Sequence, residues 1–212
     1  MSKENQQTIE VYEQFGANYL ARNANAVKEN PAAKKDNERH VAQLKEFVEE
    51  LPKDAKIFEV GSAGGRDAKI LKSLGYTNVT TSDVPEFFLN ILKDEGFSPI
   101  KFDLIKDEFP DQYDFIYCWA VLVHFKKNEA IAAINKMFGA LNDGGKIALS
   151  VKHKEGWEEE WKDQVVVAKR FFSYWTEDEL RECLKKTGFK EIEIEQYGGA
   201  RACWLECSAK KI

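Results

Sequence analysis

A glycine-rich turn is the feature with the clearest chemical potential in this sequence of 212 residues. The run Ile57-Phe-Glu-Val-Gly-Ser-Ala-Gly-Gly-Arg-Asp67 is typical of a strand, a turn and the start of a helix. Glycines let the backbone approach a ligand closely, and a helix N-terminus offers unpaired N–H donors. Because ligands bind at the carboxyl ends of strands in open α/β sheets, this turn predicts a ligand site.

The residue order in the turn excludes two common nucleotide loops. A Walker A loop needs Gly-Lys followed by Ser or Thr, and the turn contains no such run. The dinucleotide pattern G-x-G-x-x-G, started at Gly61, needs glycines where Ala63 and Arg66 stand. A nicotinamide dehydrogenase is therefore the weakest interpretation.

Acidic residues follow the next two predicted strands. Asp83 comes about 20 residues after the turn, where a ribose-binding acid is expected. A carboxylate there can accept hydrogen bonds from both ribose hydroxyls. Asp103 follows the third β-prone run. Since both acids follow strands of the same sheet, they and the turn predict one ligand site at its carboxyl edge.

The elements that must position these residues alternate along the chain. Two amphipathic helices are predicted at 8–27 and 36–51, joined by a polar segment with Pro31. Repeated strand-helix units then imply a parallel sheet with helices on both faces. Two alternating runs at the end predict an antiparallel hairpin at one edge. The expected strands are 56–60, 79–82, 99–102, 113–119, 146–151, 191–196 and 202–207, and the later helices are 66–74, 85–95, 129–141 and 176–187.

These motifs resemble those of class I S-adenosylmethionine-dependent methyltransferases. The run FEVGSAGGRD is similar to the first family motif, E/D-x-G-x-G-x-G, with Ala63 where glycine is common. Segments at Asp83, 102–104, 114–125 and 141–149 resemble the motifs that follow, with Asp143 in place of a proline. The run from Arg170 to 189 resembles a segment of small bacterial members. The resemblance spans about 150 residues in the family's order.

The resemblance implies a Rossmann-like α/β fold. The expected architecture is a seven-stranded, mostly parallel sheet with helices on both faces, an antiparallel C-terminal strand and an N-terminal helical lid. We expect a single domain over 1–212, with a helical cap at 1–52 and a cofactor-binding core at 55–152. An acceptor-covering segment at 153–175 and a C-terminal helix and β-hairpin at 176–212 complete it.

The resemblance also implies S-adenosyl-L-methionine as cofactor, with S-adenosyl-L-homocysteine as product. The glycine turn would line the methionine part, and Glu59 would help to fix its amino end. Asp83 would bind the ribose and Asp103 the adenine amine. Aromatic faces can stabilise a sulfonium cation. The complete expected cofactor set is Tyr12, Tyr19, Glu59, Gly61, Ser62, Ala63, Gly64, Asp83, Val84, Asp103, Leu104, Cys118 and Trp119.

The acceptor is expected to be a small molecule methylated on oxygen or nitrogen, because aromatic residues with a few charges fill 152–174. Arg170, Tyr174 and Trp157 are its candidate contacts. His124 and His153 follow strands at the carboxyl edge and are candidate general bases. His40 lies in a charged helix and is expected at the surface. The glutamates at 158–160 are interpreted as a solvated helix face.

Composition narrows the class of partner. The net charge of −5 and the pI near 5.4 disfavour nucleic acid. No apolar run reaches the length of a membrane span, and the polar first residues resemble no signal peptide, so we expect a cytoplasmic protein. The cysteine spacing predicts no metal site. A non-catalytic cofactor-binding module, an RNA or protein methyltransferase and an aminopropyl transferase stay open, as do the acceptor and the oligomeric state.

Overall fold

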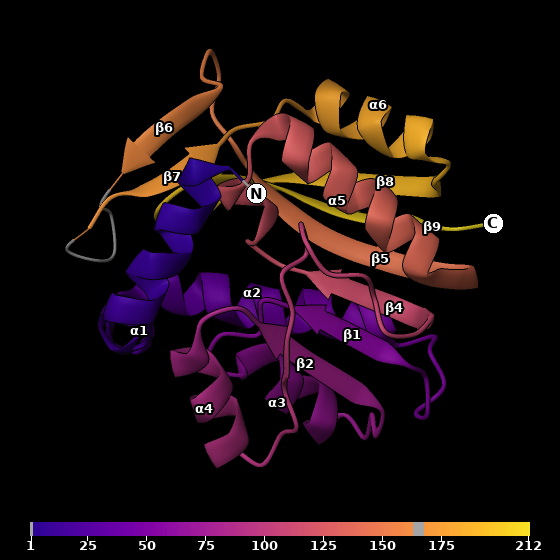
Figure 1. Cartoon of the computed structure of the whole chain (residues 1–212), viewed down its shortest axis with the longest axis horizontal. Coiled ribbons are helices and arrows are strands. Elements are labelled where there is room, and N and C mark those ends of the chain that lie inside the picture. Colours follow the sequence, from indigo (N-terminus) through magenta and orange to yellow (C-terminus); the bar gives the residue numbers. More distant parts are fainter. Residues whose placement is uncertain (1, 163–167) are drawn as a thin grey trace.

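The computed structural model of the chain describes residues 2–162 and 168–212. Its centre is a seven-stranded sheet in the order β3-β2-β1-β4-β5-β9-β8, and β6 and β7 form a separate two-stranded sheet (Figure 1). The Rossmann-like architecture expected from the sequence is confirmed. The strands are β1 (Ile57–Val60), β2 (Val79–Asp83), β3 (Ile100–Lys101), β4 (Tyr113–Cys118), β5 (Leu141–His153), β6 (Glu159–Lys162), β7 (Arg170–Ser173), β8 (Lys190–Gly198) and β9 (Cys203–Lys210).

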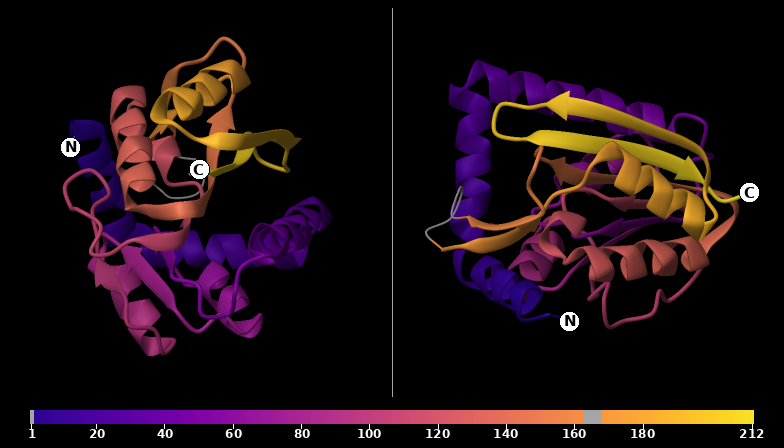
Figure 2. Two further views of the ribbon diagram at one scale, coloured as in Figure 1. Left: turned by 90° about the vertical axis from the view of Figure 1, so that its right-hand side faces the viewer. Right: turned by 90° about the horizontal axis from the view of Figure 1, so that it is seen from above.

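Helices cover both faces of the large sheet (Figure 2). One hydrophobic cluster joins α2 and α3 to one face, and a larger cluster joins α5 and α6 to the other. Alternation along the strands divides the core: Ile57 and Phe115 belong to the first cluster, whereas Phe58 and Ile116 belong to the second. The helices are α1 (Lys3–Glu29), α2 (Pro31–Val48), α3 (Arg66–Ser73), α4 (Glu86–Asp94), the short 3₁₀ helix η1 (Leu122–His124), α5 (Lys127–Ala140) and α6 (Glu177–Thr187).

The C-terminal hairpin closes the sheet as predicted. Strand β9 is antiparallel to both of its neighbours and lies between β5 and β8. The pairing of β5 with β9 runs from Lys146↔Lys210 to His153↔Cys203. Leu205 and Cys207 are consequently buried, because the inserted strand is covered on both faces. The hairpin is longer than the two runs predicted from alternation.

The two N-terminal helices meet with no polar segment between them, which corrects the sequence prediction. Asn30 alone separates them, and its side chain accepts from the backbone N–H groups of Ala32 and Ala33. Pro31 is the first residue of α2, a position at which the missing N–H costs nothing. Helix α1 has a kink at Phe15, where φ is −120°.

The region after β5 also differs from expectation. The glutamates interpreted as a helix face lie at β6, whose register pairs Glu160 with Phe172 of β7. Pairing with an apolar strand overrides the helical preference of a short charged run. Part of the expected acceptor-covering segment, residues 163–167, lies outside the described residues.

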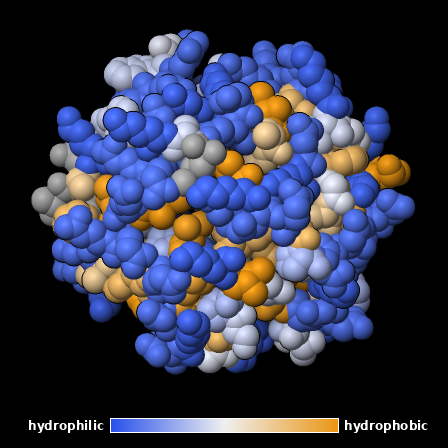
Figure 3. Space-filling view, viewed as in Figure 1, coloured by the Kyte–Doolittle hydropathy of each residue, from blue (hydrophilic) through white to orange (hydrophobic). Residues whose placement is uncertain are grey.

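The surface carries only small hydrophobic patches on the face seen in Figure 3. Hydrophilic side chains cover most of that face. Within the two described ranges, no helix combines the length and apolar character that crossing a membrane requires.

Candidate active site

A cavity of about 120 Å³ lies at the carboxyl ends of β1 to β4, beneath α1. Strands β1 and β4 are neighbours, while β2 and β3 continue on the other side of β1, so the strand order reverses here. Such reversal points are the ligand sites of open α/β sheets. Most of the expected cofactor residues line this cavity: Tyr12, Tyr19, Gly61, Ala63, Asp83, Val84, Asp103, Leu104 and Trp119.

Gly61 brings backbone without a side chain to the cavity wall. Its φ is +71°, and a Cβ there would lie 2.5 Å from Cγ2 of Val121. Ala63 has a φ of +45°, which glycine adopts at lower cost. The turn therefore takes a left-handed conformation even where glycine is absent.

Asp83 closes the turn from the end of β2. Its two carboxylate oxygens accept from the backbone N–H groups of Ala63 and Val84, both at 2.8 Å. Burial raises the pKa of Asp83 to about 6, although both N–H groups favour the charged form. The carboxylate lines the cavity and retains lone pairs that can accept further hydrogen bonds.

Two further acids stand at the turn and at β3. Asp103 accepts from the backbone N–H of Ile105 at 3.0 Å, and Nζ of Lys106 is 3.3 Å away. Glu59 is buried behind the turn, and its Oε2 has no hydrogen-bond partner among the described residues. Burial and the neighbouring charge of Asp67 raise the pKa of Glu59 to about 8.

His124 joins the cavity to α1 and β7. Its Nδ1 is 2.7 Å from the carbonyl oxygen of Phe171, which can only accept, so Nδ1 carries the proton. Nε2 then accepts from the hydroxyl of Tyr12, 3.0 Å away. The Tyr12 oxygen in turn accepts from Nη1 of Arg170. Burial, helped by the charges of Arg170 and Lys152, lowers the pKa of His124 to about 3, so the ring is neutral near pH 7.

Comparison with known families decides the class of protein. A family profile described as methyltransferase domain matches residues 33–194, most of the chain. The chain belongs to this methyltransferase family. The class expected from the sequence is confirmed.

Solved structures similar to the methyltransferase share its fold. One is the magnesium protoporphyrin IX methyltransferase of Synechocystis PCC 6803 with bound SAM, with a TM-score of 0.76, 17% identity, and coverage of 100% of this chain and 99% of that one. The 1,6-didemethyltoxoflavin-N1-methyltransferase of Burkholderia thailandensis has a TM-score of 0.70 and 17% identity, with coverage of 100% and 91%. A DhpI–SAM–HEP complex has a TM-score of 0.76 and 16% identity, with 99% of each chain covered. No curated protein sequence matches the chain.

A buried ion cluster supports the turn of the methyltransferase and corrects one prediction. His40, expected at the surface, is buried, with Nε2 at 2.9 Å from Oδ1 of Asp67. Although burial opposes it, Arg66 and His40 hold the pKa of Asp67 well below its usual range. The spacing carried a signal: His40, Leu44 and Val48 share one helix face, and all three are buried.

Several expected residues of the methyltransferase lie away from the cavity. His153 bonds the carbonyl of Trp175 through Nδ1 at 2.8 Å. The Tyr174 hydroxyl donates to Glu160, and Trp157 is 48% exposed beneath Nζ of Lys154. Five expected cofactor or acceptor residues do not line the cavity although they adjoin its walls: Glu59, Ser62, Gly64, Cys118 and Arg170.

The sequence analysis missed cavity residues on α1. Asn5 and Thr8 line the cavity together with Tyr12. Thr8 also accepts from the backbone N–H of Phe171 at 3.2 Å, so α1 is bonded to β7. The spacing of positions 5, 8 and 12 places all three on one helix face, and that periodicity was the available signal.

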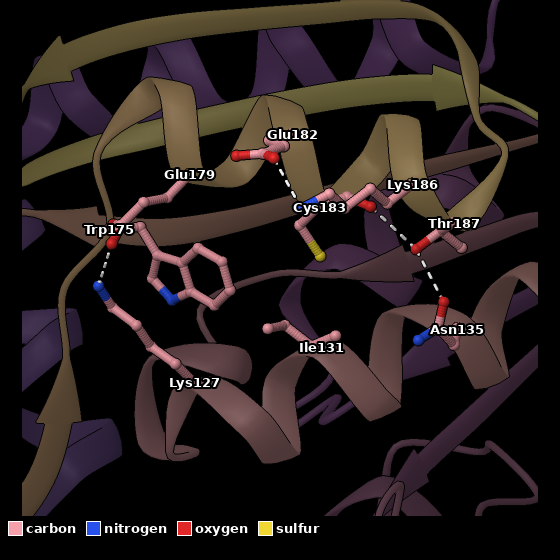
Figure 4. A pocket seen from close by; sticks show the side chains of 9 residues that line it. All are labelled: Lys127, Ile131, Asn135, Trp175, Glu179, Glu182, Cys183, Lys186 and Thr187. Atoms are coloured by element: carbon pink, nitrogen blue, oxygen red, sulfur yellow. Dashed lines mark hydrogen bonds and ion pairs between the residues drawn. The ribbon is translucent and has the colours of Figure 1, made fainter.

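A second cavity, of about 330 Å³, lies between α5 and α6 (Figure 4). Trp175, Ile131 and Cys183 point toward it in the close-up, and a hydrogen bond of 2.8 Å joins Thr187 to Asn135 at its edge. None of the residues expected to bind cofactor or acceptor lines it. Among the described residues, no group of three His, Cys, Asp or Glu side chains could hold a metal ion.

Proposed function

We propose that this methyltransferase transfers the methyl group of S-adenosylmethionine to a small-molecule acceptor. The observation that supports this function is the cavity at the strand reversal, where the Gly61 turn, Asp83 and α1 meet. When bound, S-adenosylmethionine supplies a methyl group already activated on a sulfonium. The protein's contribution is then chiefly to hold the reactants in line.

The residues of the cavity suit each part of that cofactor. The lack of a side chain at Gly61 lets the backbone reach the cavity, and a Cβ there would clash with Val121, which also lines the cavity. The unpartnered Oε2 of Glu59 suits an amino group. Asp83 would accept from the ribose hydroxyls and Asp103 from the adenine amine, since both carboxylates line the cavity.

Helix α1 would act as a lid. The cavity of about 120 Å³ is smaller than the ligand pockets of about 300–1,000 Å³ that are typical of proteins. Tyr12 and Tyr19 both project into it from α1. Admission of a cofactor therefore requires α1 to shift, and its return would exclude water from the reactants. Glu13 links α1 to α4 by accepting from the backbone N–H of Glu86 at 2.7 Å.

The size of the cavity also supports a small acceptor. Its volume of about 120 Å³ beneath α1 suits a small molecule better than a nucleic-acid strand or a folded protein surface. His124 lines it as a neutral ring, but a pKa of about 3 makes this histidine a weak base. We therefore assign His124 a positioning role: it fixes the Tyr12 hydroxyl at the cavity wall.

Thermal shift tests the cofactor assignment. S-adenosylmethionine and S-adenosylhomocysteine should each raise the Tm of the protein, and NAD should not. The Asp83→Ala variant should lose most of the shift, because it removes the ribose acceptor. Asp143→Ala is the matched control, since the Asp143 side chain is 98% exposed. Methyl transfer itself is followed as the methylated product formed from labelled donor and a mixed pool of small acceptors. Absence of any shift with folded wild-type protein would contradict the proposal.

A further inference from the structure

Arg170 is a buried cation at the edge of the cavity. It is 3% exposed, and Nη1 donates to the Tyr12 hydroxyl that lines the cavity. Its Nε has no hydrogen-bond partner in the described part of the chain. No carboxylate of those residues lies within the 4.0 Å of an ion pair with this guanidinium. A guanidinium buried without a counter-ion is unfavourable unless a ligand supplies one.

Aromatic rings hold the guanidinium in place without satisfying it. Its Cζ lies 5.2 Å from the ring centroids of Tyr12 and of Phe172, and 6.0 Å from that of Tyr19. Cation–π contacts offset part of the desolvation cost. They do not use the in-plane N–H donors, of which a guanidinium has five. The orientation of Arg170 is thus fixed while donors stay available.

A second cation shares this part of the wall. Lys152 is buried, with Nζ 3.6 Å from the ring centroid of Phe172. The same ring lies 4.8 Å from the ring of His124, which is neutral. Asp83 is a cavity acid whose charge acts on Tyr12. Its carboxylate already accepts hydrogen bonds from two backbone N–H groups. Arg170 and Lys152 therefore both lie against the ring of Phe172 in β7.

The proposed cofactor adds a positive charge, its sulfonium, to that of Arg170. Like charges repel strongly where water is excluded, so an anion is needed for both substrates to bind together. We propose that Arg170 holds an oxyanion of the methyl acceptor, a carboxylate or a phosphoryl group, and that the acceptors are therefore small anions. This inference rests on the proposed function.

Calorimetry on protein saturated with S-adenosylhomocysteine tests it. The probes are benzoate and phenylphosphonate, with benzamide as the neutral analogue of similar shape. Both anions should bind and benzamide should not, and the tighter anion identifies a carboxylate or a phosphoryl site. Arg170→Met should weaken the anions about ten- to a hundredfold, since a charge-assisted hydrogen bond is lost. Arg201→Met, at an exposed arginine, should leave binding unchanged.

The controls separate this inference from the cofactor assignment. If wild-type protein does not bind S-adenosylhomocysteine, the proposed function fails first. If benzamide binds as well as benzoate, the anion site is wrong. If Arg170→Met loses the cofactor product as well, Arg170 serves the carboxylate of the cofactor and the inference is overturned. Arg170→Lys keeps the charge and serves as the second variant if Arg170→Met does not fold, and it should retain weakened anion binding.

Discussion

The hydroxyl of Tyr12 lies 3.0 Å from Nε2 of His124, although 112 positions separate the two residues. The contact belongs to a chain of hydrogen bonds that runs from Arg170 through Tyr12 and His124 to the carbonyl of Phe171. The first and last residues of this hydrogen-bond chain, Arg170 and Phe171, are both in β7. Helix α1 is therefore hydrogen-bonded to β7 through Tyr12. Each donor in this chain has one acceptor, which fixes the histidine tautomer.

Removal of the Tyr12 hydroxyl should destabilise the fold. In Tyr12→Phe, Nε2 of His124 and Nη1 of Arg170 each lose a buried partner, which costs about 1–3 kcal/mol. Denaturant unfolding followed by circular dichroism measures the loss. Tyr19→Phe is the matched control, because Tyr19 is on the same helix but outside the chain of bonds. Its change should stay below about 0.5 kcal/mol; equal losses in both variants would contradict this role of Tyr12.

His124 should make the stability of the protein dependent on pH. Its pKa is about 3 in the fold and near 6.5 in the unfolded chain, so below pH 6.5 the unfolded chain binds a proton that the folded protein does not. Stability is therefore lost as the pH falls from about 6.5 toward 3. The difference in unfolding free energy between wild type and His124→Asn should shrink over that range, by up to about 1.4 kcal/mol per pH unit. A constant difference between pH 7 and pH 4 would refute it.

Cofactor binding should weaken in mild acid. Protonation of Asp83, whose pKa is about 6, removes the negative charge that strengthens the hydrogen bonds proposed from the ribose hydroxyls. Below pH 6 the affinity for S-adenosylhomocysteine should fall by about tenfold per pH unit, as measured by calorimetry. Asp83→Asn should bind more weakly at pH 7.5 and show a flatter profile. An unchanged slope in Asp83→Asn would assign the titration to another group.

A side chain at Gly61 should clash with Val121 and distort the cavity wall that both residues line. Gly61→Ala places a Cβ 2.5 Å from Val121 in a left-handed conformation, which should cost about 1–2 kcal/mol in stability and weaken binding of S-adenosylhomocysteine. Gly61→Ala combined with Val121→Ala should recover part of the stability, since the clash is then removed. Gly139→Ala is the control, because a Cβ there meets nothing within 4 Å. Normal cofactor affinity in folded Gly61→Ala would exclude the turn from the site.

Some of the site follows from local sequence. Gly61, Asp83 and Asp103 each stand directly after a predicted strand, and in a parallel sheet those positions reach the same edge. Their convergence on one cavity therefore needs only the order of the elements. The position of β9 between β5 and β8 could not be predicted in the same way. Alternation of apolar and polar residues indicates which runs form strands, but it does not indicate which strands are neighbours.

Other parts depend on packing between distant elements. The face of α2 that carries His40 is buried because it packs against α3, which carries Asp67 in its first turn, and against the strands of the sheet. Tyr174 and Trp157 were expected beside the acceptor, but the Tyr174 hydroxyl donates to the side chain of Glu160 in β6, and Trp157 is exposed.

The sequence by itself determined the fold class, the family and the strand ends that carry the cofactor motif. Only the tertiary structure decided that Arg170, Tyr12 and His124 form one bonded chain beside Phe172. The physical reason is the separation along the sequence between the residues that interact. Motif residues adjoin the strands that place them, whereas a buried cation acquires its neighbours from contacts between α1 and β7 that no local pattern encodes.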